Sequence, residues 1–206
     1  YLSTDWMFPR VPEPDGVLLQ DSHVKIKGSC ADLDSMGARN ILLRRQQHFK
    51  FTAVCKMKMP QLYPGQDAGM TCYYDENTFV KFATQEPQPR LIVKAVEVIG
   101  EQVKESGSIE LDFRRQDVYL KIETNDLKRT CYMSYDGKEY IKVAVLENVY
   151  YLCDEGLKKG KRFTGAMIGM YAYAGDFGSR YVDEYGRHGD DTLYVDFDWF
   201  DYQPEK

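Results

Sequence analysis

The stretch from Leu42 to Glu76 constrains the fold of this chain more than any other part of the sequence. From Phe49 to Met59, apolar residues at every second position alternate mainly with lysine and threonine. A period of two is typical of a β-strand with one apolar face. A turn rich in Pro and Gly follows at 60–65, and a second alternating run starts at Ala68. The stretch therefore predicts a long antiparallel strand pair.

Short strand patterns fill the rest of the chain, without a long amphipathic helix or an internal repeat. Val17–Leu19 and Val24–Ile26 are expected to form a hairpin, and Asp136-Gly137 marks another, because Asp-Gly favours the tight turns that join antiparallel strands. The only helical segment that we expect is one or two turns within 147–161. These patterns predict an all-β chain folded as an antiparallel two-sheet β-sandwich.

The closing strand is expected at Thr192–Tyr202, after a long loop at 174–191 that is rich in Gly, Asp and Tyr. Strict alternation places Leu193, Val195, Phe197 and Trp199 on one face of this strand. The same alternation places Tyr194, Asp196, Asp198 and Phe200 on the other face.

Residues 1–16 form an extended lead-in or linker, and residues 17–206 form the sandwich domain. Three prolines, Pro9, Pro12 and Pro14, prevent regular structure in the lead-in. Trp6 and Phe8 are expected to anchor it to the domain. The chain starts at Tyr1 rather than Met, as a piece excised from a longer protein would.

Charge and hydropathy exclude two classes of partner. The formal net charge is −5, which speaks against nucleic acid and anionic membranes because both require a basic surface. No apolar run approaches the roughly 18 residues of a membrane-spanning helix.

The five cysteines, Cys30, Cys55, Cys72, Cys131 and Cys153, cannot all be paired, and none of their spacings is that of a zinc site. Cys55, Cys72 and Cys131 share strand faces with Phe, Met and Tyr, as buried free thiols do. Free thiols favour a reducing compartment such as the cytoplasm.

Catalytic motifs are missing from the sequence: it has three histidines but no nucleophile elbow, HExxH motif or phosphate-binding loop. Asp196 and Asp198 are expected on one strand face about 7 Å apart. Such a pair could serve as glycosidase carboxylates in a free-standing enzyme. The competing interpretation is a solvated, metal-binding or hydrogen-bonding edge.

Sugar binding is the alternative chemistry that the residues allow. Arg45, Gln47 and His48 belong to a polar cluster that forms either a sugar site or a hydrogen-bonded strand end. Tyr73, Tyr171 and Tyr173 face away from the most apolar side of their strands. They are either platforms on which sugar rings stack or the ordinary aromatic cover of a half-exposed sheet.

Several segments, taken in order, resemble one known domain family. They are WMFPRVPEPDGV near the start, LLRRQQHFKFTA and GQDAGMTCYYDE in the central pair, and RFTGAMIGMYA and VDFDWFDY near the end. The sequence resembles, over essentially its full length, the C-terminal concanavalin-A-like sandwich (jelly roll) of family 43 glycoside hydrolases of the β-xylosidase type. This domain is also classed as carbohydrate-binding module family 91.

The resemblance implies a non-catalytic carbohydrate-binding module that recognises xylan or xylo-oligosaccharides. It also implies the alternative of an accessory structural domain with little sugar affinity, in which Phe163 helps to close the active site of a catalytic propeller domain in the same polypeptide. The catalytic carboxylates of the family lie in that propeller, so this chain alone is expected to be inactive. The 174–191 loop is longer than the family's usual connection.

Sandwiches of this architecture often hold one structural calcium ion near the last strand. Asp198 is then the expected side-chain ligand, because calcium prefers carboxylate and carbonyl oxygens. No other cofactor is expected.

Overall fold

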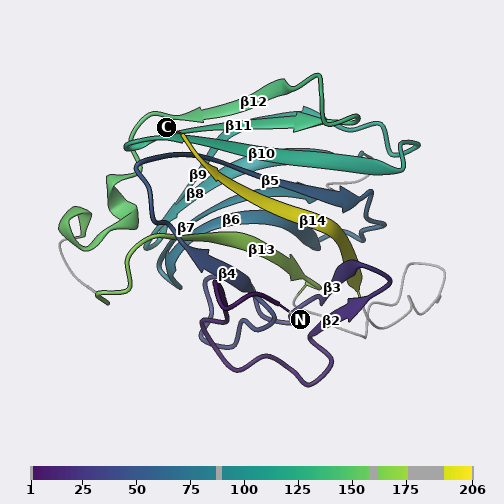
Figure 1. Ribbon diagram of the computed structural model, residues 1–206, viewed down its shortest axis with the longest axis horizontal. Coiled ribbons are helices and arrows are strands. Elements are labelled where there is room, and N and C mark those ends of the chain that lie inside the picture. Colours follow the sequence, from purple (N-terminus) through teal and green to yellow (C-terminus); the bar gives the residue numbers. More distant parts are fainter. Residues whose placement is uncertain (1, 87–89, 158–161, 176–192, 206) are drawn as a thin grey trace.

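Two antiparallel sheets of seven strands each make up the computed structural model, which describes residues 2–86, 90–157, 162–175 and 193–205 (Figure 1). Sheet A has the order β1 (Trp6–Met7), β4 (Leu42–Arg45), β13 (Met167–Tyr173), β6 (Asp67–Asp75), β7 (Thr78–Gln85), β8 (Ile92–Ile99) and β9 (Gln102–Glu110). Sheet B has the order β12 (Ile141–Leu146), β11 (Lys128–Ser134), β10 (Asp117–Asn125), β5 (Lys50–Lys58), β14 (Tyr194–Pro204), β3 (His23–Lys27) and β2 (Val17–Gln20). The predicted antiparallel two-sheet sandwich is confirmed.

The central pair splits between the two layers instead of forming one hairpin. β5 lies in the middle of sheet B and β6 lies in sheet A, so the Pro/Gly turn at 60–65 carries the chain from one sheet to the other. The predicted apolar face of β5 is confirmed from Phe51 to Met57, whose alternate side chains are buried between the sheets. Phe49, the first residue of the predicted pattern, lies outside the strand and is exposed.

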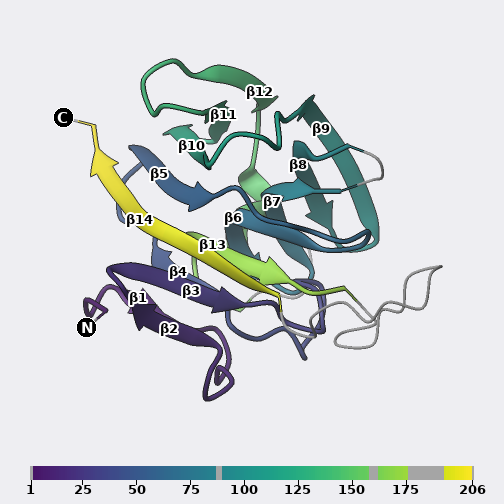
Figure 2. The same cartoon turned by 90° about the vertical axis from the view of Figure 1, so that its right-hand side faces the viewer.

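The sheets are joined along one side by a close backbone approach. Their edge strands β9 and β12 come together near the top of Figure 2. Gly107 of β9 lies so near Val143 of β12 that a Cβ atom there would be 2.2 Å from the Val143 carbonyl oxygen. Only glycine permits this approach, so the sandwich closes at this position.

The turns behave as the sequence predicts. β2 and β3 pair across Asp21 and Ser22, which both have positive φ angles, as a tight hairpin turn requires. β11 and β12 flank the Asp136-Gly137 turn. The expected short helical segment is present as two 3-10 turns, η1 (Tyr150–Leu152) and η2 (Asp154–Gly156). None of the helices in the described residues is long and apolar enough to span a membrane.

The lead-in is more ordered than the prolines suggest. Trp6–Met7 forms a two-residue strand on β4, just ahead of the proline cluster. Trp6 and Phe8 pack against the core, which confirms their role as anchors, and the Trp6 ring meets the Phe200 ring edge-on at 5.1 Å. Most of the long loop predicted at 174–191 falls outside the described residues.

The predicted faces of β14 are wrong beyond Phe197. A bulge places Asp198 and Trp199 together opposite Lys56 of β5, and an extra residue inverts the alternation that follows it. Phe200 and Tyr202 therefore pack against the core, and Trp199 turns outward with 40% of its surface exposed.

Candidate functional site

The most unusual side chain in the described structure is Phe163. It lies between η2 and β13, its ring is 82% exposed and its backbone has φ +57°. A bulky residue in the left-handed region is uncommon, and a large apolar ring in water gains no burial energy. We call residues 162–164 the Phe163 segment.

A network of hydrogen bonds holds the backbone of the Phe163 segment in place. The Tyr74 hydroxyl donates to the Asp154 carboxylate, and the same carboxylate accepts the Phe163 N–H at 3.0 Å. The Arg162 N–H donates to the Tyr74 hydroxyl at 2.6 Å. Because Tyr74 is buried in the sandwich core, the core itself supports the segment.

Side chains on both flanks of the segment add further contacts. The Arg45 guanidinium donates to the Thr164 carbonyl, and the Arg162 guanidinium contacts Glu76 at 2.6 Å and Asp75 at 3.4 Å. Coulombic attraction to Glu76 raises the pKa of Arg162 above its ordinary value. The segment is thus fixed on a rigid base while its ring is left without protein contacts on most of its surface.

A hollow of about 410 Å³ lies beside the Phe163 segment and unites several of the predicted residues. Arg45, Tyr73, Arg162 and Thr164 line it, together with side chains from the lead-in and from β13. Arg10 of the lead-in donates to the Tyr73 hydroxyl at 3.2 Å and pairs with Glu76 at 3.4 Å. The structure therefore brings Arg45, Tyr73 and Phe163 into one region.

Gln47 and His48 lie apart from that hollow, at the C-terminal end of β14. The Gln47 N–H donates to the Tyr202 hydroxyl at 3.1 Å, and His48 Nδ1 lies 3.2 Å from the same oxygen. Both side chains are exposed. This is the hydrogen-bonded strand end that the sequence left open as one alternative, and it leaves both residues accessible to a ligand.

The three predicted tyrosine platforms are buried. Tyr73, Tyr171 and Tyr173 lie on the outer face of sheet A, as their alternation predicts, but they are only 2%, 1% and 9% exposed. Residues 28–41 cross this face and pack Leu33, Ala38 and Ile41 against the rings, forming a second apolar cluster. Of the two interpretations that the sequence left open, open stacking platforms do not fit these buried rings, because a loop covers the strand face that alternation alone leaves free.

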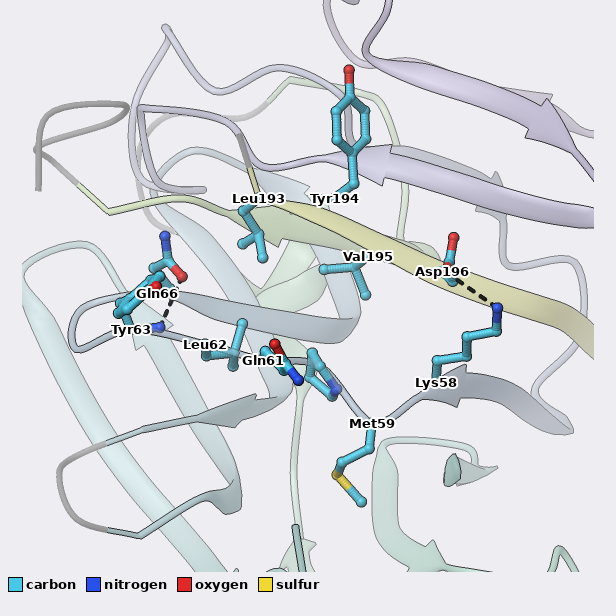
Figure 3. Close-up of a pocket in the computed structure, with 11 residues that line it drawn as sticks. Lys58, Met59, Gln61, Leu62, Tyr63, Gln66, Leu193, Tyr194, Val195 and Asp196 are labelled. Atoms are coloured by element: carbon cyan, nitrogen blue, oxygen red, sulfur yellow. Dashed lines mark hydrogen bonds and ion pairs between the residues drawn. The ribbon is translucent and has the colours of Figure 1, made fainter. Parts of the chain in front are cut away.

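Asp196 and Asp198 are engaged by lysines. Asp198 accepts from Lys56 at 2.8 Å, and Asp196 lies 3.8 Å from Lys25 and 3.5 Å from Lys58. The hydrogen bond from Lys56 holds the pKa of Asp198 below its ordinary value. Figure 3 shows Asp196 and Lys58 reaching toward each other beside a pocket of about 570 Å³.

These contacts do not fit a calcium ion at Asp198, because Lys56 occupies the place beside the carboxylate that a cation would need. Within the described residues, no group of three or more His, Cys, Asp or Glu side chains could hold a metal ion. Lysine side chains pair with both carboxylates. The pKa of Asp198 is lowered, whereas the acid of a glycosidase requires a raised pKa.

Sequence reasoning missed the supports of the site. Asp154 and Tyr74 are distant in sequence, and no local pattern relates them. A buried lysine, Lys81, was also missed, since it lies in an apolar strand where a single charge is easily taken for an outward-facing one. Asp75 and Glu76 are neighbours in sequence, but their arginine partners, Arg10 and Arg162, come from distant parts of the chain.

Comparison with known proteins places this geometry in context. Residues 1–203 match the family model described as the β-xylosidase C-terminal concanavalin A-like domain. The crystal structure of the GH43 protein BlXynB from Bacillus licheniformis is similar over the whole chain, with 30% identity and a TM-score of 0.87, and the chain covers 38% of it.

Two further relatives agree with this match. A putative β-xylosidase of Escherichia coli strain K12 is 26% identical over 176 residues, which are 84% of this chain and 30% of that protein. The xylan β-1,4-xylosidase from Bacillus halodurans shares the fold, with a TM-score of 0.83, 23% identity and coverage of 98% of this chain and 37% of that one. The chain thus spans roughly a third of the length of these relatives. It belongs to the family of C-terminal concanavalin A-like domains of β-xylosidases.

Proposed function

We propose that this chain is an accessory domain that completes the active site of a family 43 glycoside hydrolase by presenting Phe163. The observation that carries the proposal is an 82% exposed ring on a backbone fixed by Asp154 and Tyr74. Exposure and positive φ both disfavour the folded domain by itself. A second surface that buries the ring explains why the segment is built in this way.

The relatives support a catalytic partner for this domain. Two of them are named as β-xylosidases and the third as a GH43 protein, and they are about three times as long as this chain. We infer that the remaining length carries the catalytic domain and that the chain by itself is not an enzyme. A ring closing the mouth of a substrate pocket excludes water and contacts the apolar face of a terminal sugar.

The test is a pair of phenylalanine substitutions in the polypeptide that contains the catalytic domain. Burying a Phe side chain contributes about 1.5–3 kcal/mol, so Phe163→Ala should lower kcat/KM on an aryl β-xyloside about tenfold or more. Phe113 is similarly exposed, at 72%, and Phe113→Ala serves as the matched control. Equal activity of both variants and the parent would overturn the capping function.

As a second function we propose the binding of xylan or xylo-oligosaccharides. The observation in its favour is a groove of about 790 Å³ on the outer face of sheet A, lined by carboxylate, amide, lysine and apolar side chains. This volume is typical of ligand sites, and a neutral, hydroxyl-rich ligand suits the acidic chain. Affinity electrophoresis in gels that contain soluble xylan tests it, with cellulose and mannan derivatives as controls, and retardation by xylan alone is expected.

A further inference from the structure

The groove on the outer face of sheet A crosses four neighbouring strands, β6 to β9. At the usual spacing of about 4.8 Å between strands, it extends over roughly 14 Å, which is the length of a short oligosaccharide and not of a single sugar. The loop at 28–41 covers the part of this face that belongs to β13. Asp32 and Asp34 of the loop line the groove.

The floor at one end of the groove is a buried cation between two carboxylates. Lys81 Nζ lies 2.8 Å from Asp67 and 2.5 Å from Asp32, and the Gln85 amide donates to Asp67 at 3.2 Å. The side chains of Lys81 and Asp67 are 9% and 5% exposed, whereas that of Asp32 is 25% exposed. Asp32 is therefore the accessible carboxylate of this cluster, and its contact with the buried Lys81 fixes its position at the surface of the groove.

Strand register explains how these groups meet. Asp67 pairs with Gln85 across β6 and β7, and with Tyr173 across β6 and β13. Lys81 projects from the same face of β7, and its ammonium group lies 5.3 Å from the centre of the Tyr173 ring. The strand pairing thus brings the Tyr173 ring and the Gln85 amide together with the charged groups of Lys81 and Asp67.

The cluster formed by Lys81, Asp67, Asp32 and Gln85 contains more buried polar and charged groups than the stability of the fold requires. Burial lowers the pKa of Lys81, but Asp67 and Asp32 more than offset it, so the pKa is raised and the side chain is cationic at neutral pH. Apolar side chains of similar volume stabilise a core at least as well as a buried ion pair does. The Asp67 Oδ1 atom is moreover buried without a hydrogen bond of normal geometry. The arrangement is typical of a preorganised polar site.

The other half of the groove has apolar side chains in its floor and wall, beside Glu76, Asn77 and Glu101. Val98 pairs with Phe79 on β7 and with Val103 on β9, and all three line the groove. Val103 is 70% exposed. A row of aliphatic side chains beside fixed acceptors matches a pyranose ring, which has apolar C–H faces and hydroxyl edges.

The charge of the lining selects among polysaccharides. Six carboxylates and two lysines line the groove. Such a surface repels an anionic chain over distances shorter than the Debye length of about 8 Å at physiological salt. A neutral ligand carries no such penalty.

We propose that this groove is the binding site for a neutral xylan chain, which rests on the proposed sugar-binding function. Asp32 and Gln85 bond the sugar hydroxyls at the charged end. Val98 and Val103 contact the ring faces at the other end. Lys81 and Asp67 are positioning residues that hold Asp32 and Gln85 in place.

Affinity electrophoresis of the 206-residue chain tests the site with two groove variants. Asp32→Asn removes one charge and leaves Lys81 paired with Asp67, and Val103→Arg places a long side chain in the groove from an exposed strand position. Ile141, which is 50% exposed on β12 of the other sheet, supplies the matched control Ile141→Arg.

We expect neutral arabinoxylan to retard the parent and Ile141→Arg equally, with affinity about tenfold lower for both groove variants, since a hydrogen bond to a charged group contributes enough for such a change. Glucuronoxylan should retard the parent less than arabinoxylan does. Equal retardation of the parent and both groove variants would show that sugar binds elsewhere on the chain. Absence of retardation for the parent itself would overturn the sugar-binding function, and the groove assignment with it.

Discussion

At the scale of single residues, Phe163 combines two features that lower the stability of the isolated domain. Its φ of +57° is unfavourable for an L-residue with a side chain, and its ring stays in water. The hydrogen bonds that Asp154 and Tyr74 accept from the backbone N–H groups of the Phe163 segment offset the backbone strain. Strain that the surroundings enforce at one exposed position indicates a functional requirement there.

We therefore expect Phe163→Gly to leave the domain as stable as the parent or more stable. Relief of the left-handed conformation contributes about 1–2 kcal/mol, and the larger backbone entropy of unfolded Gly removes about 0.5–1 kcal/mol of it. Urea unfolding of the two proteins measures the difference. A loss of more than about 1 kcal/mol would show that the ring contributes to the folded domain itself.

Lys81, unlike Phe163, stabilises the folded domain, because it is buried and paired with a carboxylate. Lys81→Met should lower the free energy of unfolding by about 3–5 kcal/mol, since it leaves the Asp67 carboxylate buried without its cation. Lys94 on β8 lines the same groove and contacts Glu105 at 3.7 Å. Lys94→Met serves as the control in the same urea titration, with an expected change below about 1 kcal/mol. Similar losses for the two variants would contradict the buried ion pair.

At the scale of elements, alternation in the sequence predicted β5, β6 and β13 with their correct faces. The pattern works there because the inner face of a sandwich strand is uniformly apolar. It failed on β14, where the bulge opposite Lys56 adds a residue that no local pattern reveals. It also could not indicate that residues 28–41 cover Tyr73 and Tyr171, because the cover comes from a loop without periodicity.

The bulge on β14 can be tested by two alanine substitutions. Phe200→Ala should destabilise the domain by about 2 kcal/mol, because its half-buried ring packs on Trp6 and on the core. Trp199→Ala should cost less than about 1 kcal/mol, although Trp is larger, because its ring points outward. Unfolding curves in urea give both values. A larger loss of stability for Trp199→Ala than for Phe200→Ala would instead support uninterrupted alternation along β14.

The β11–β12 hairpin turn should contribute a defined acid sensitivity. Backbone N–H groups of Lys138 and Glu139, followed by the Ser134 hydroxyl, bond Asp136 and lower its pKa to about 2. A lowered pKa in the folded state gives stability that is present above the ordinary value of 3.8 and lost as pH falls toward about 2. Melting temperatures of the parent and Asp136→Ala should therefore converge between about pH 4 and pH 2. A difference that stays constant over that range would contradict the bonded carboxylate.

At the scale of the whole molecule, the Phe163 segment and the groove meet at the turn between β6 and β7. Glu76 lines the groove and also pairs with Arg162 and Arg10. Residues from the lead-in, sheet A and the segment before β13 thus converge on one side of the sandwich. The family and the fold could be predicted from sequence motifs, but this convergence depends on pairings between residues more than 60 positions apart.

The proposed capping function makes a direct claim about where the Phe163 ring lies in the complete enzyme. The most direct measurement is photo-crosslinking with p-benzoylphenylalanine at position 163 of the polypeptide that contains the catalytic domain, with the same residue at position 113 as the control. We predict that the product from position 163 joins the segment to peptides at the substrate pocket, and that a xylo-oligosaccharide reduces its yield. Crosslinks confined to the sandwich, or a yield that sugar does not change, would contradict the account.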